Sequence, residues 1–475
     1  MRIRPSADVL VSNTKQNLEE AAMNLATTVA QPLPDLAENL PRRVHSTIRP
    51  RSVADVRKAV IEAGETGVAL YPISRGLNWG LGSRKPVDHD CAILDLSGMD
   101  RIRHIDLDRG YAVIEAGVTQ GELSDQLKET RFFLNVTTSA RESSVIGNAL
   151  DRGQGMMRLR AHDLIGLEAV LGDGKVLTTG VFGNAGGRSA SGVVAGPDLT
   201  KIFCHSNFGV VTAATISLIR RPERTVYVYG AFEGAAMPAV VEAIYRMRHD
   251  GVFRSIFYLG EMQIDQGDGP RPRFTVLGPL VGRDTIVEAA ERIVLEELHK
   301  IPGCTSLRSG PVDELDPSDP VYLRARMFVG EPTSDMIKQR FGTTTTALDE
   351  NSIKGWSVIQ TLLPHDSGSV DEAMAIVARA VDEFGISAHP HLSTVSSRSI
   401  NLMTMIWFDR SPEGSECMRT MRDKLHRELR ERGFLPSREG IDALHEGASD
   451  RPGEASALLK RALDPQGIIS PGRYV

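Results

Sequence analysis

Two glycine-rich segments carry the residue types that could bind a large polar ligand. The first, YPISRGLNWGLGSRKP, spans 71–86 and spaces three glycines as G-x-x-x-G-x-G from Gly76. This spacing differs from the dinucleotide-binding fingerprint, and no Gly-Lys-Ser/Thr ending makes it a Walker loop. Backbone N–H groups of so flexible a segment can converge on an anion, and Arg75 and Asn78 could add donors. Spacing alone leaves an irregular turn as an equally good interpretation.

The second segment, SSVIGNALDRGQG, spans 143–155 and adds Asn148, Asp151 and Arg152 to a set of small residues. A strand-rich stretch separates it from the first segment, so folding could bring the two together. Two loops of this kind predict a large polar ligand. For Asp151 and Arg152, a surface salt bridge is the alternative interpretation.

Composition and charge are those of an ordinary globular protein. The 475 residues are 41% hydrophobic and 24% charged, and the formal net charge is -6. Such a mild acidic bias argues against a nucleic-acid partner. Four scattered cysteines without a C-x-x-C pair argue against a disulfide framework or a structural zinc site. The charged N-terminus and the lack of an apolar run of about 20 residues predict a cytoplasmic protein without a membrane segment.

The length of the chain predicts two domains, because one ordinary core does not grow so large. Helix formers followed by prolines predict a helical arm over 1–43. Residues 44–221 alternate short β-branched runs with helices and turns. They include a helix capped by Ser52, a hairpin at the Asp-Gly turn of LEAVLGDGKVLTTG, and a pair of strands in GVVTAATISLIRRP. This mixture of short strands, helices and turns is typical of an α+β domain.

Residues 222–455 have longer helices and predict a second domain. Two segments share the order strand, polar turn, long helix: VYVYGAFEGAAMPAVVEAIYRMRHDG and INLMTMIWFDRSPEGSECMRTMRDKLHRELRERG. We interpret them as a pseudo-repeat of an antiparallel sheet covered by helices. The last segment, 456–475, is a helix end followed by a Pro/Gly-rich turn.

A series of motifs extends over nearly all of 44–221 and returns at the end of the chain. These are RPRSVADVRKAVIEA…PISRGLNWGLG, VIGNALDRGQG, GLEAVLGDGKVLTTG, SNFGVVTAATISLI and the tail ALDPQGIISPGR. In order and spacing they resemble the FAD-binding flavoproteins of the vanillyl-alcohol oxidase and p-cresol methylhydroxylase (PCMH) family. The resemblance implies a two-domain α+β fold: a PCMH-type FAD-binding domain over 44–221, an antiparallel-sheet cap covered by helices over 222–455, and a C-terminal segment that returns to the FAD domain.

The resemblance also implies FAD as the cofactor and suggests its contacts. Backbone amides of the first segment would wrap the pyrophosphate, residues of the second would lie along the pyrophosphate, ribityl and isoalloxazine, and Val211 would read the adenine edge. A diphosphate requires donors and a cation, and close backbone approach requires small side chains. The implied cofactor-binding residues are Ile73, Ser74, Arg75, Gly76, Leu77, Asn78, Trp79, Gly80, Ser144, Gly147, Asn148, Asp151, Arg152, Gly153, Val211 and Arg473.

The sequence departs from the family at the residues that tether FAD covalently. The matching place in SRSINLMTMIWF is Asn401 or Leu402, and neither side chain forms that bond. In the first segment, Asn78 or a neighbour stands where some relatives carry a tethering histidine. We therefore predict that FAD is bound noncovalently and can dissociate.

A second departure concerns the substrate. Leu81 stands where phenol-oxidising members carry a tyrosine, and their C-terminal Tyr-Arg pair is Ser437-Arg438 here. The arginine remains the best candidate for a substrate anchor, because a guanidinium can hold a phenolate, an enolate or a carboxylate bidentately. A rim ion pair with Glu439 is the alternative. The departures remove the ground for expecting a 4-alkylphenol.

Four further residues are candidates for catalysis. His162 and Asp163 could act as a general base near the flavin, although a structural histidine is an equal alternative. His391 shares a strand face with His389 and could line the pocket, while a metal site lacks a third ligand. Arg398 is a pocket candidate through its proximity to the matched strand.

Together these features predict an FAD-dependent oxidase or dehydrogenase. It would transfer a hydride from a C–H or an alcohol C–H of a small aromatic or specialised-metabolite substrate to flavin N5, and O2 or another acceptor would reoxidise the flavin. The alternatives are a 2-hydroxy-acid dehydrogenase on the same fold and a flavoprotein that catalyses a non-redox cyclisation or elimination. The sequence leaves open the substrate, the acceptor, the base and whether the chain forms a homo-oligomer.

Overall fold

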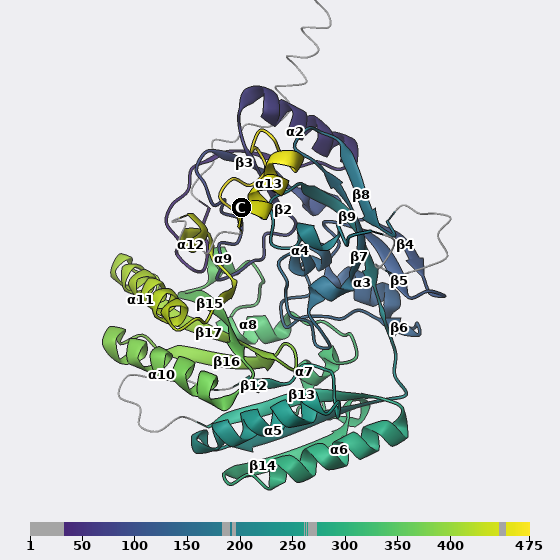
Figure 1. Cartoon of the computed structure of the whole chain (residues 1–475), viewed down its shortest axis with the longest axis vertical. Helices are drawn as coiled ribbons and strands as arrows, with labels where there is room; N and C mark the ends of the chain where they lie inside the picture. The colour runs from purple at the N-terminus through teal and green to yellow at the C-terminus, as the bar shows by residue number, and fades with distance from the viewer. Residues whose placement is uncertain are drawn as a thin grey trace, which may run out of the picture.

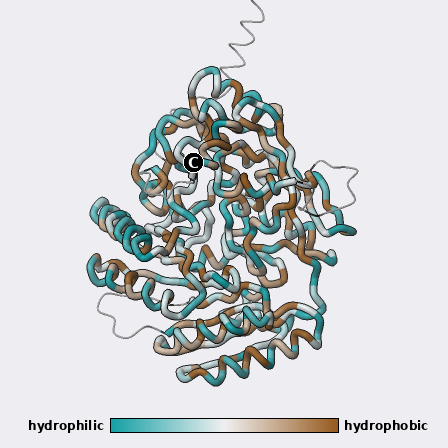
Figure 2. The backbone as a smooth tube through the Cα atoms, viewed as in Figure 1, coloured by the Kyte–Doolittle hydropathy of each residue, from teal (hydrophilic) through white to brown (hydrophobic). Residues whose placement is uncertain are grey.

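The structure is a computed structural model that describes residues 33–182, 191, 196–260, 262, 264, 273–445 and 453–475. Of the predicted helical arm 1–43, residues 1–32 lie outside this range, and 33–43 contain a turn and no helix. Within the described residues, no helix is both long and apolar enough to cross a membrane. The hydropathic colouring of Figure 2 places much of the apolar chain inside the molecule.

A small parallel sheet begins the N-terminal half (Figure 1). Its strands are, in order, β1 (Val44–Ile48), β3 (Cys91–Asp95) and β2 (Leu70–Ile73). Helix α2 (Val53–Thr66) begins after Ser52, whose side chain accepts a hydrogen bond from the Asp55 N–H, and it ends at left-handed Gly67. The predicted helix capped by Ser52 is confirmed. Strand β2 leads directly into the first glycine-rich segment.

A five-stranded antiparallel sheet forms the rest of this half. Its strands are, in order, β4 (Ile102–Asp106), β5 (Tyr111–Glu115), β9 (Val210–Ser217), β7 (Leu164–Val170) and β8 (Val176–Gly180). Helices α3 (Gln120–Leu127) and α4 (Val145–Leu150) lie in the connection between β5 and β7. The Asp-Gly hairpin is confirmed as β7 and β8, with Gly174 at φ 78°.

The predicted strand pair in GVVTAATISLIRRP is two strands that do not pair with each other. β9 belongs to the five-stranded sheet, whereas β10 (Ile219–Arg220) pairs with β6 (Phe132–Phe133). Leu218 separates β9 from β10, and its N–H donates to the carbonyl of Gly110. The chain therefore leaves one sheet before it enters the next.

The C-terminal half is built on one eight-stranded antiparallel sheet made of two β-α-β-β-α-β units. The first unit contains β11 (Arg224–Phe232), α5 (Met237–His249), β12 (Tyr258–Gly260), β13 (Phe274–Gly282), α6 (Asp284–His299) and β14 (Cys304–Pro311). The second contains β15 (Lys354–Pro364), α10 (Ser367–Phe384), β16 (Ala388–Thr394), β17 (Ser399–Asp409), α11 (Pro412–Glu431) and β18 (Pro436–Arg438).

The two units meet where β12 pairs with β16. If the strands of each unit are numbered along the chain, they lie in the order fourth, first, third, second from the outer edge of the sheet to its middle. Both predicted repeat segments fall on a strand followed by a helix, β11 with α5 and β17 with α11. The predicted antiparallel sheet covered by helices is therefore confirmed. The helices lie on one side of the sheet in Figure 1 and leave the other side facing the N-terminal half.

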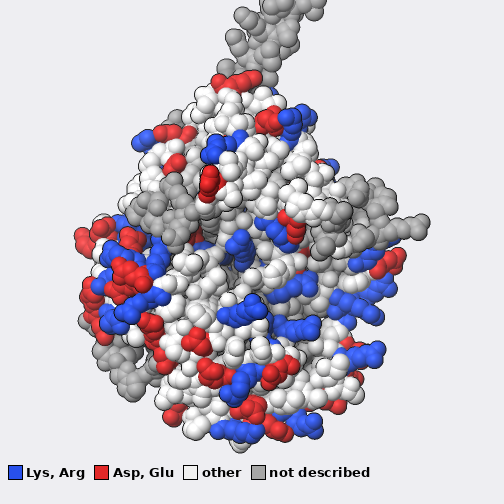
Figure 3. All heavy atoms as spheres, in the orientation of Figure 1, with Lys and Arg blue, Asp and Glu red and all other residues white. Residues whose placement is uncertain are grey.

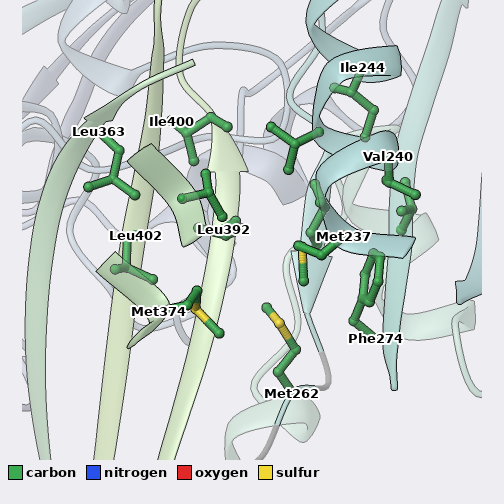
Figure 4. Packing of buried hydrophobic residues seen from close by; sticks show 14 of the residues in the cluster. Met237, Val240, Ile244, Met262, Phe274, Leu363, Met374, Leu392, Ile400 and Leu402 are labelled. Atoms are coloured by element: carbon green, nitrogen blue, oxygen red, sulfur yellow. The ribbon is translucent and has the colours of Figure 1, made fainter. Parts of the chain in front are cut away.

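Side chains alternate between the two faces of this sheet. On the helix side, apolar residues from α5, α10 and the strands form one core, which Figure 4 shows at Met237, Ile244, Met374, Leu392 and Leu402. Burial of these side chains against the helices fixes which strand residues are left for the opposite face.

Two connections complete the fold. Between the units lie α7 (Tyr322–Met327), α8 (Asp335–Phe341) and α9 (Leu348–Asn351), and after the sheet come α12 (Ile441–His445) and α13 (Glu454–Leu463). The end of the chain then returns to β2, where the Ser470 N–H donates to the Leu70 carbonyl at 2.7 Å. We propose on this arrangement that the domains divide near residue 221 and that the tail completes the first domain.

Replacement of Leu402 tests which face of the cap sheet forms its core. Leu402 is fully buried on the helix side, so Leu402→Ala should lower the free energy of unfolding by about 2–5 kcal/mol. The control is Leu362→Ala, because Leu362 lies on the other face and is 37% exposed; its loss should stay below about 1 kcal/mol. Urea denaturation followed by circular dichroism measures both, and equal losses would contradict the assigned faces.

Candidate active site

A cavity of about 320 Å³ lies between the N-terminal half and the open face of the cap sheet. Its lining on one side comes from both glycine-rich segments and from residues around 203–211. On the other side it comes from β15, β16, β17 and α8, and the C-terminal tail closes one end. Enclosed sites of this size between domains are typical of small-molecule binding.

The sheet side of the cavity is a regular array of side chains. Arg438 on β18 pairs with Gln360 on β15, Gln360 with Met403 on β17, and Met403 with His391 on β16. All four residues line the cavity. The strand register therefore sets a cation, an amide, a thioether and an imidazole in one row across four strands.

The two glycine-rich segments touch, as the sequence predicted. A Cβ atom at Gly147 would lie only 2.3 Å from the Ser74 Oγ, so a larger residue there would displace that hydroxyl. Gly76 and Gly80 adopt φ values of 66° and 77°, in the left-handed region. A Cβ at Gly80 would also lie 2.7 Å from the Val358 side chain of β15. The first segment therefore needs glycine both to turn and to pack against the cap.

Asp151 is the carboxylate that two arginines of the cavity share. It pairs with Arg473 of the tail at 2.9 Å and with Arg438 of the cap at 3.3 Å. Arg438 also donates to the Asn78 Oδ1 at 2.8 Å. Arg473 donates to the Tyr71 hydroxyl beside the first glycine-rich segment. One carboxylate thus joins its own segment to the cap and the tail, and the two arginines extend the contact to the first glycine-rich segment.

Electrostatics fix the protonation of this cluster. Burial opposes ionisation of Asp151, but the positive charges of Arg473 and Arg438 outweigh it and hold the pKa of that carboxyl well below its usual range. His205, whose ring stacks on Tyr474 at 4.7 Å between centroids, has its pKa lowered to about 4 by burial. At neutral pH the cluster therefore contains an ionised Asp151 and a neutral His205.

Several buried polar atoms on the cavity lining have no hydrogen-bond partner within the described residues. Native proteins leave few such atoms, and a ligand is one explanation for a group of them around one cavity. They are Trp79 Nε1, Asn148 Oδ1, Gln154 Nε2, His205 Nε2, Ser206 Oγ, Asn207 Oδ1, Trp356 Nε1 and Arg438 Nε. Together with the glycine segments and the paired arginines, these donors and acceptors fit a long polar cofactor such as FAD.

Most of the sequence-predicted cofactor residues line the cavity. Those that do are Ile73, Ser74, Arg75, Gly76, Leu77, Asn78, Trp79, Ser144, Gly147, Asn148, Asp151, Val211 and Arg473. Three do not. Gly80 packs against the cap, and Gly153 lies behind the Asn148 side chain. Arg152 follows the end of α4 with a left-handed backbone, φ 49°, and lines a neighbouring cavity.

The structure places His162, Asp163 and Arg398 away from the cavity lining. His162 is exposed, and Asp163 is buried in ion pairs with Arg158 and Arg160 at 2.6 and 3.5 Å. Arg398 is exposed in the turn between β16 and β17. The buried ion cluster satisfies Asp163 structurally. These three therefore lack the position that a base or a substrate anchor would need.

Of the remaining candidates, Arg438 and His391 line the cavity. His389 does not, although it shares a strand face with His391. Within the described residues, no group of three or more His, Cys, Asp or Glu side chains could hold a metal ion. Asn401 faces the cavity and accepts a hydrogen bond from the Ser437 hydroxyl at 2.8 Å, whereas Leu402 is buried beneath the helices.

Sequence reasoning missed several lining residues. Tyr71 is the first residue of the first glycine-rich segment and Tyr474 follows the tail motif, so the nearby motifs were the available signal. Gln360 lies on β15, which carries none of the identified motifs, so the sequence contained no signal for it. Arg340 on α8 lies in a helix whose polar sequence, DMIKQRF, reads as an ordinary surface helix. Only the tertiary arrangement brings its side chain to the cavity.

Comparisons with known proteins agree with this geometry. Residues 45–180 match the model of the FAD binding domain family. The 1'-carboxy-chondrochloren decarboxylase of Chondromyces crocatus is 29% identical over 91% of this chain and 90% of its own. The flavoprotein subunit of 4-cresol dehydrogenase (hydroxylating) from Pseudomonas putida is 24% identical over 92% and 88%.

A solved structure of p-cresol methylhydroxylase with substrate bound superposes with a TM-score of 0.82, at 21% identity over 93% of this chain and 91% of that one. Fold and cavity thus define a two-domain flavoprotein with a cap over the cofactor domain. The chain is an FAD-dependent oxidoreductase with FAD as its cofactor, and it is similar in sequence and fold to flavoproteins of the vanillyl-alcohol oxidase and p-cresol methylhydroxylase type.

Asp151→Asn tests the role of the shared carboxylate as a structural tie. The variant leaves Arg438 and Arg473 without their common counter-ion, so the free energy of unfolding should fall by about 1–3 kcal/mol. Amide hydrogen exchange in 469–475 should also accelerate. In the wild type, the lowered pKa of Asp151 means that this stabilisation is fully present at any pH above the ordinary aspartate pKa. It is lost as the pH falls through the folded-state pKa of Asp151.

The matched control for this variant is Asp90→Asn, which breaks the exposed Arg43–Asp90 pair. Asn also tolerates the left-handed backbone at this position, where φ is 61°. Its loss should be much smaller than that of Asp151→Asn, because an exposed ion pair contributes little to stability. A similar loss in the two variants would show that Asp151 is only a surface partner.

Proposed function

We propose that the cavity binds FAD noncovalently and that a small organic substrate is oxidised against it. The observation that carries the proposal is the two-sided lining: glycine-rich segments and unpartnered polar atoms on one side, and the Arg438–Gln360–Met403–His391 row on the other. In this arrangement a substrate held by the cap sheet would lie between that sheet and the cofactor. FAD supplies the hydride acceptor at N5 when it is bound.

Different residues of the chain would contact different parts of FAD. The backbone of 73–79 and the Arg473 guanidinium would hold the pyrophosphate, with Asp151 orienting that guanidinium. Val211 would lie at the adenine end. Asn401 at the family's tethering position offers no nucleophile, which supports dissociable FAD.

Arg438 is the proposed anchor for an oxyanion of the substrate. Its Nη2 is engaged by Asn78 and Asp151, while its buried Nε has no partner within the described residues. An N–H donor left free in this way can hydrogen-bond to a phenolate, an enolate or a carboxylate and stabilise its negative charge. Neutral His391, farther along the row, can accept or donate a hydrogen bond without adding charge. We propose O2 or another carrier as the acceptor and the cytoplasm as the location.

A second candidate reaction is the removal of a carboxyl group. The relative from Chondromyces crocatus matches nearly the whole chain and is named as a decarboxylase. A 2-hydroxy acid remains a further substrate class for the hydride-transfer reaction, because Arg438 can hold a carboxylate as well as a phenolate. Bleaching of the flavin separates redox turnover from a reaction in which the flavin is not reduced.

Acid precipitation of the purified yellow protein tests the mode of FAD binding. Because neither Asn401 nor Asn78 can form a covalent bond to the isoalloxazine, the flavin should stay in the supernatant when the protein denatures. Absorbance of supernatant and pellet near the flavin band measures the division. Yellow colour retained in the washed pellet would contradict noncovalent binding.

Arg438→Ala tests the substrate anchor. Anaerobic mixing of the FAD-loaded protein with 4-hydroxybenzyl alcohol, 4-ethylphenol, mandelate and 2-hydroxyglutarate should identify a substrate that bleaches the flavin. With that substrate, the variant should reduce the flavin roughly 100- to 1,000-fold more slowly while keeping its FAD. Arg398→Ala, outside the cavity, should behave as the wild type.

Two results would contradict the assignment. Product formed while the flavin stays oxidised would exclude hydride transfer. Loss of FAD from Arg438→Ala, with no change in the reduction rate of the molecules that retain it, would place Arg438 among the cofactor contacts and not at the substrate.

A further inference from the structure

Arg340 is a cation on the cavity lining that no carboxylate neutralises within the described residues. It lies near the end of α8 (Asp335–Phe341), in the connection between the two units of the cap. Its guanidinium Nη1 contacts the Met405 Sδ at 3.7 Å, a weak interaction for a charged donor. A guanidinium without a carboxylate partner on a cavity lining is well suited to bind an anionic ligand.

The accessible surface of Arg340 opens on the cavity. The residue is exposed, yet protein surrounds the guanidinium closely enough that burial lowers its pKa to about 10. These two properties agree if the side chain projects into an enclosed space connected to solvent. At a pKa of about 10 the guanidinium stays charged at neutral pH.

Each of the other arginines of the cavity has a carboxylate partner. Four arginines and one carboxylate line it: Arg75, Arg340, Arg438, Arg473 and Asp151. Arg438 and Arg473 share Asp151, and Arg75 pairs with Glu122 at 3.4 Å and donates to the Gly117 carbonyl. Arg340 is therefore the arginine on the described lining that has no carboxylate partner.

Its surroundings place Arg340 on the substrate side. Met405 follows Met403 on the cavity face of β17, and Ile337, one helical turn before Arg340, packs with Leu81 and Val358. Burial, followed by the charges of Arg324 and Arg340, lowers the pKa of the neighbouring His391 well below the usual value and keeps it neutral. By contrast, the proposed pyrophosphate contacts at Asp151 and Arg473 belong to the tail end of the cavity.

The surface around this helix is also basic. Figure 3 shows Lys and Arg side chains gathered over the middle of the face where α4, α7 and α8 lie in Figure 1. Such a field favours the approach of anions. Arg324 on α7 adds positive charge from within, and its guanidinium lies 5.6 Å from the ring centre of Tyr258, another lining residue.

We propose that Arg340 is a specificity-determining residue that binds a carboxylate of the substrate at the cap end of the cavity. This inference rests on the proposed function and narrows its substrate class: the substrate carries an anionic group apart from the one that Arg438 holds. A molecule with an oxidisable carbon between a hydroxyl or enol group and a carboxylate fits both arginines. The carboxylate would lie beside α8, with His391 available as a neutral hydrogen-bond partner.

Binding of matched probes to the FAD-loaded protein tests the proposal. The probes are 4-hydroxyphenylacetate and its uncharged amide, which differ only in the group that Arg340 would meet. Calorimetric titration should give a wild-type preference for the carboxylate of roughly tenfold or more. Arg340→Gln should remove that preference by weakening carboxylate binding roughly 10- to 100-fold, with the amide unchanged, and Arg340→Lys should retain part of it.

Lys338→Gln is the control, because it removes a positive charge from the same helix at a residue that does not line the cavity. It should keep the wild-type preference. A wild-type protein that binds neither probe or prefers the amide, or an Arg340→Gln variant that still prefers the carboxylate, would overturn the proposal. Binding needs no turnover, so failure of hydride transfer would appear separately, as a flavin that no substrate bleaches.

Discussion

The ion pairs of Asp151 with Arg438 and Arg473 are the interaction on which the site depends. Asp151 ends α4 in the FAD-binding domain, Arg438 comes from the last strand of the cap sheet, and Arg473 comes from the tail. Segments separated by about 290 to 320 residues meet at one carboxylate. The net lowering of its pKa shows that the two guanidinium groups outweigh the cost of burial.

The cap sheet gives the cavity its other wall through the alternation of its strands. Leu392, Leu402 and their neighbours bind the helix layer, and this burial forces His391, Met403 and Gln360 to the opposite face. Changing the register of one strand would exchange the two sets. The same packing that stabilises the cap therefore aligns the row that would face the substrate, and α8 adds Arg340 from the connection between the two units.

Much of the cofactor side could be predicted from the sequence, because close backbone approach leaves a local signature. Gly76 and Gly147 stand where a turn or a close contact favours glycine, and such preferences produce motifs that can be read along the chain. Substrate-side residues have no such signature. Arg340 is an arginine in a short polar helix, and only the fold reveals that it faces a cavity.

The site predictions that the structure does not support, at Asp163 and Arg398, also depend on information that the sequence lacks. Asp163 follows the second segment closely and looks available for catalysis, yet Arg158 and Arg160, at nearby positions in the sequence, bind its carboxylate. Arg398 adjoins a matched strand but lies in its turn. Proximity along the chain did not predict which side of an element a side chain would face.

The most direct test of this account is a crystal structure of the FAD-loaded protein. We expect the pyrophosphate to lie against the backbone of 73–79 and within reach of Arg473, with the isoalloxazine between the first glycine-rich segment and the Arg438–His391 row. Density for FAD outside this cavity, or an isoalloxazine turned away from the cap sheet, would contradict the proposed active site.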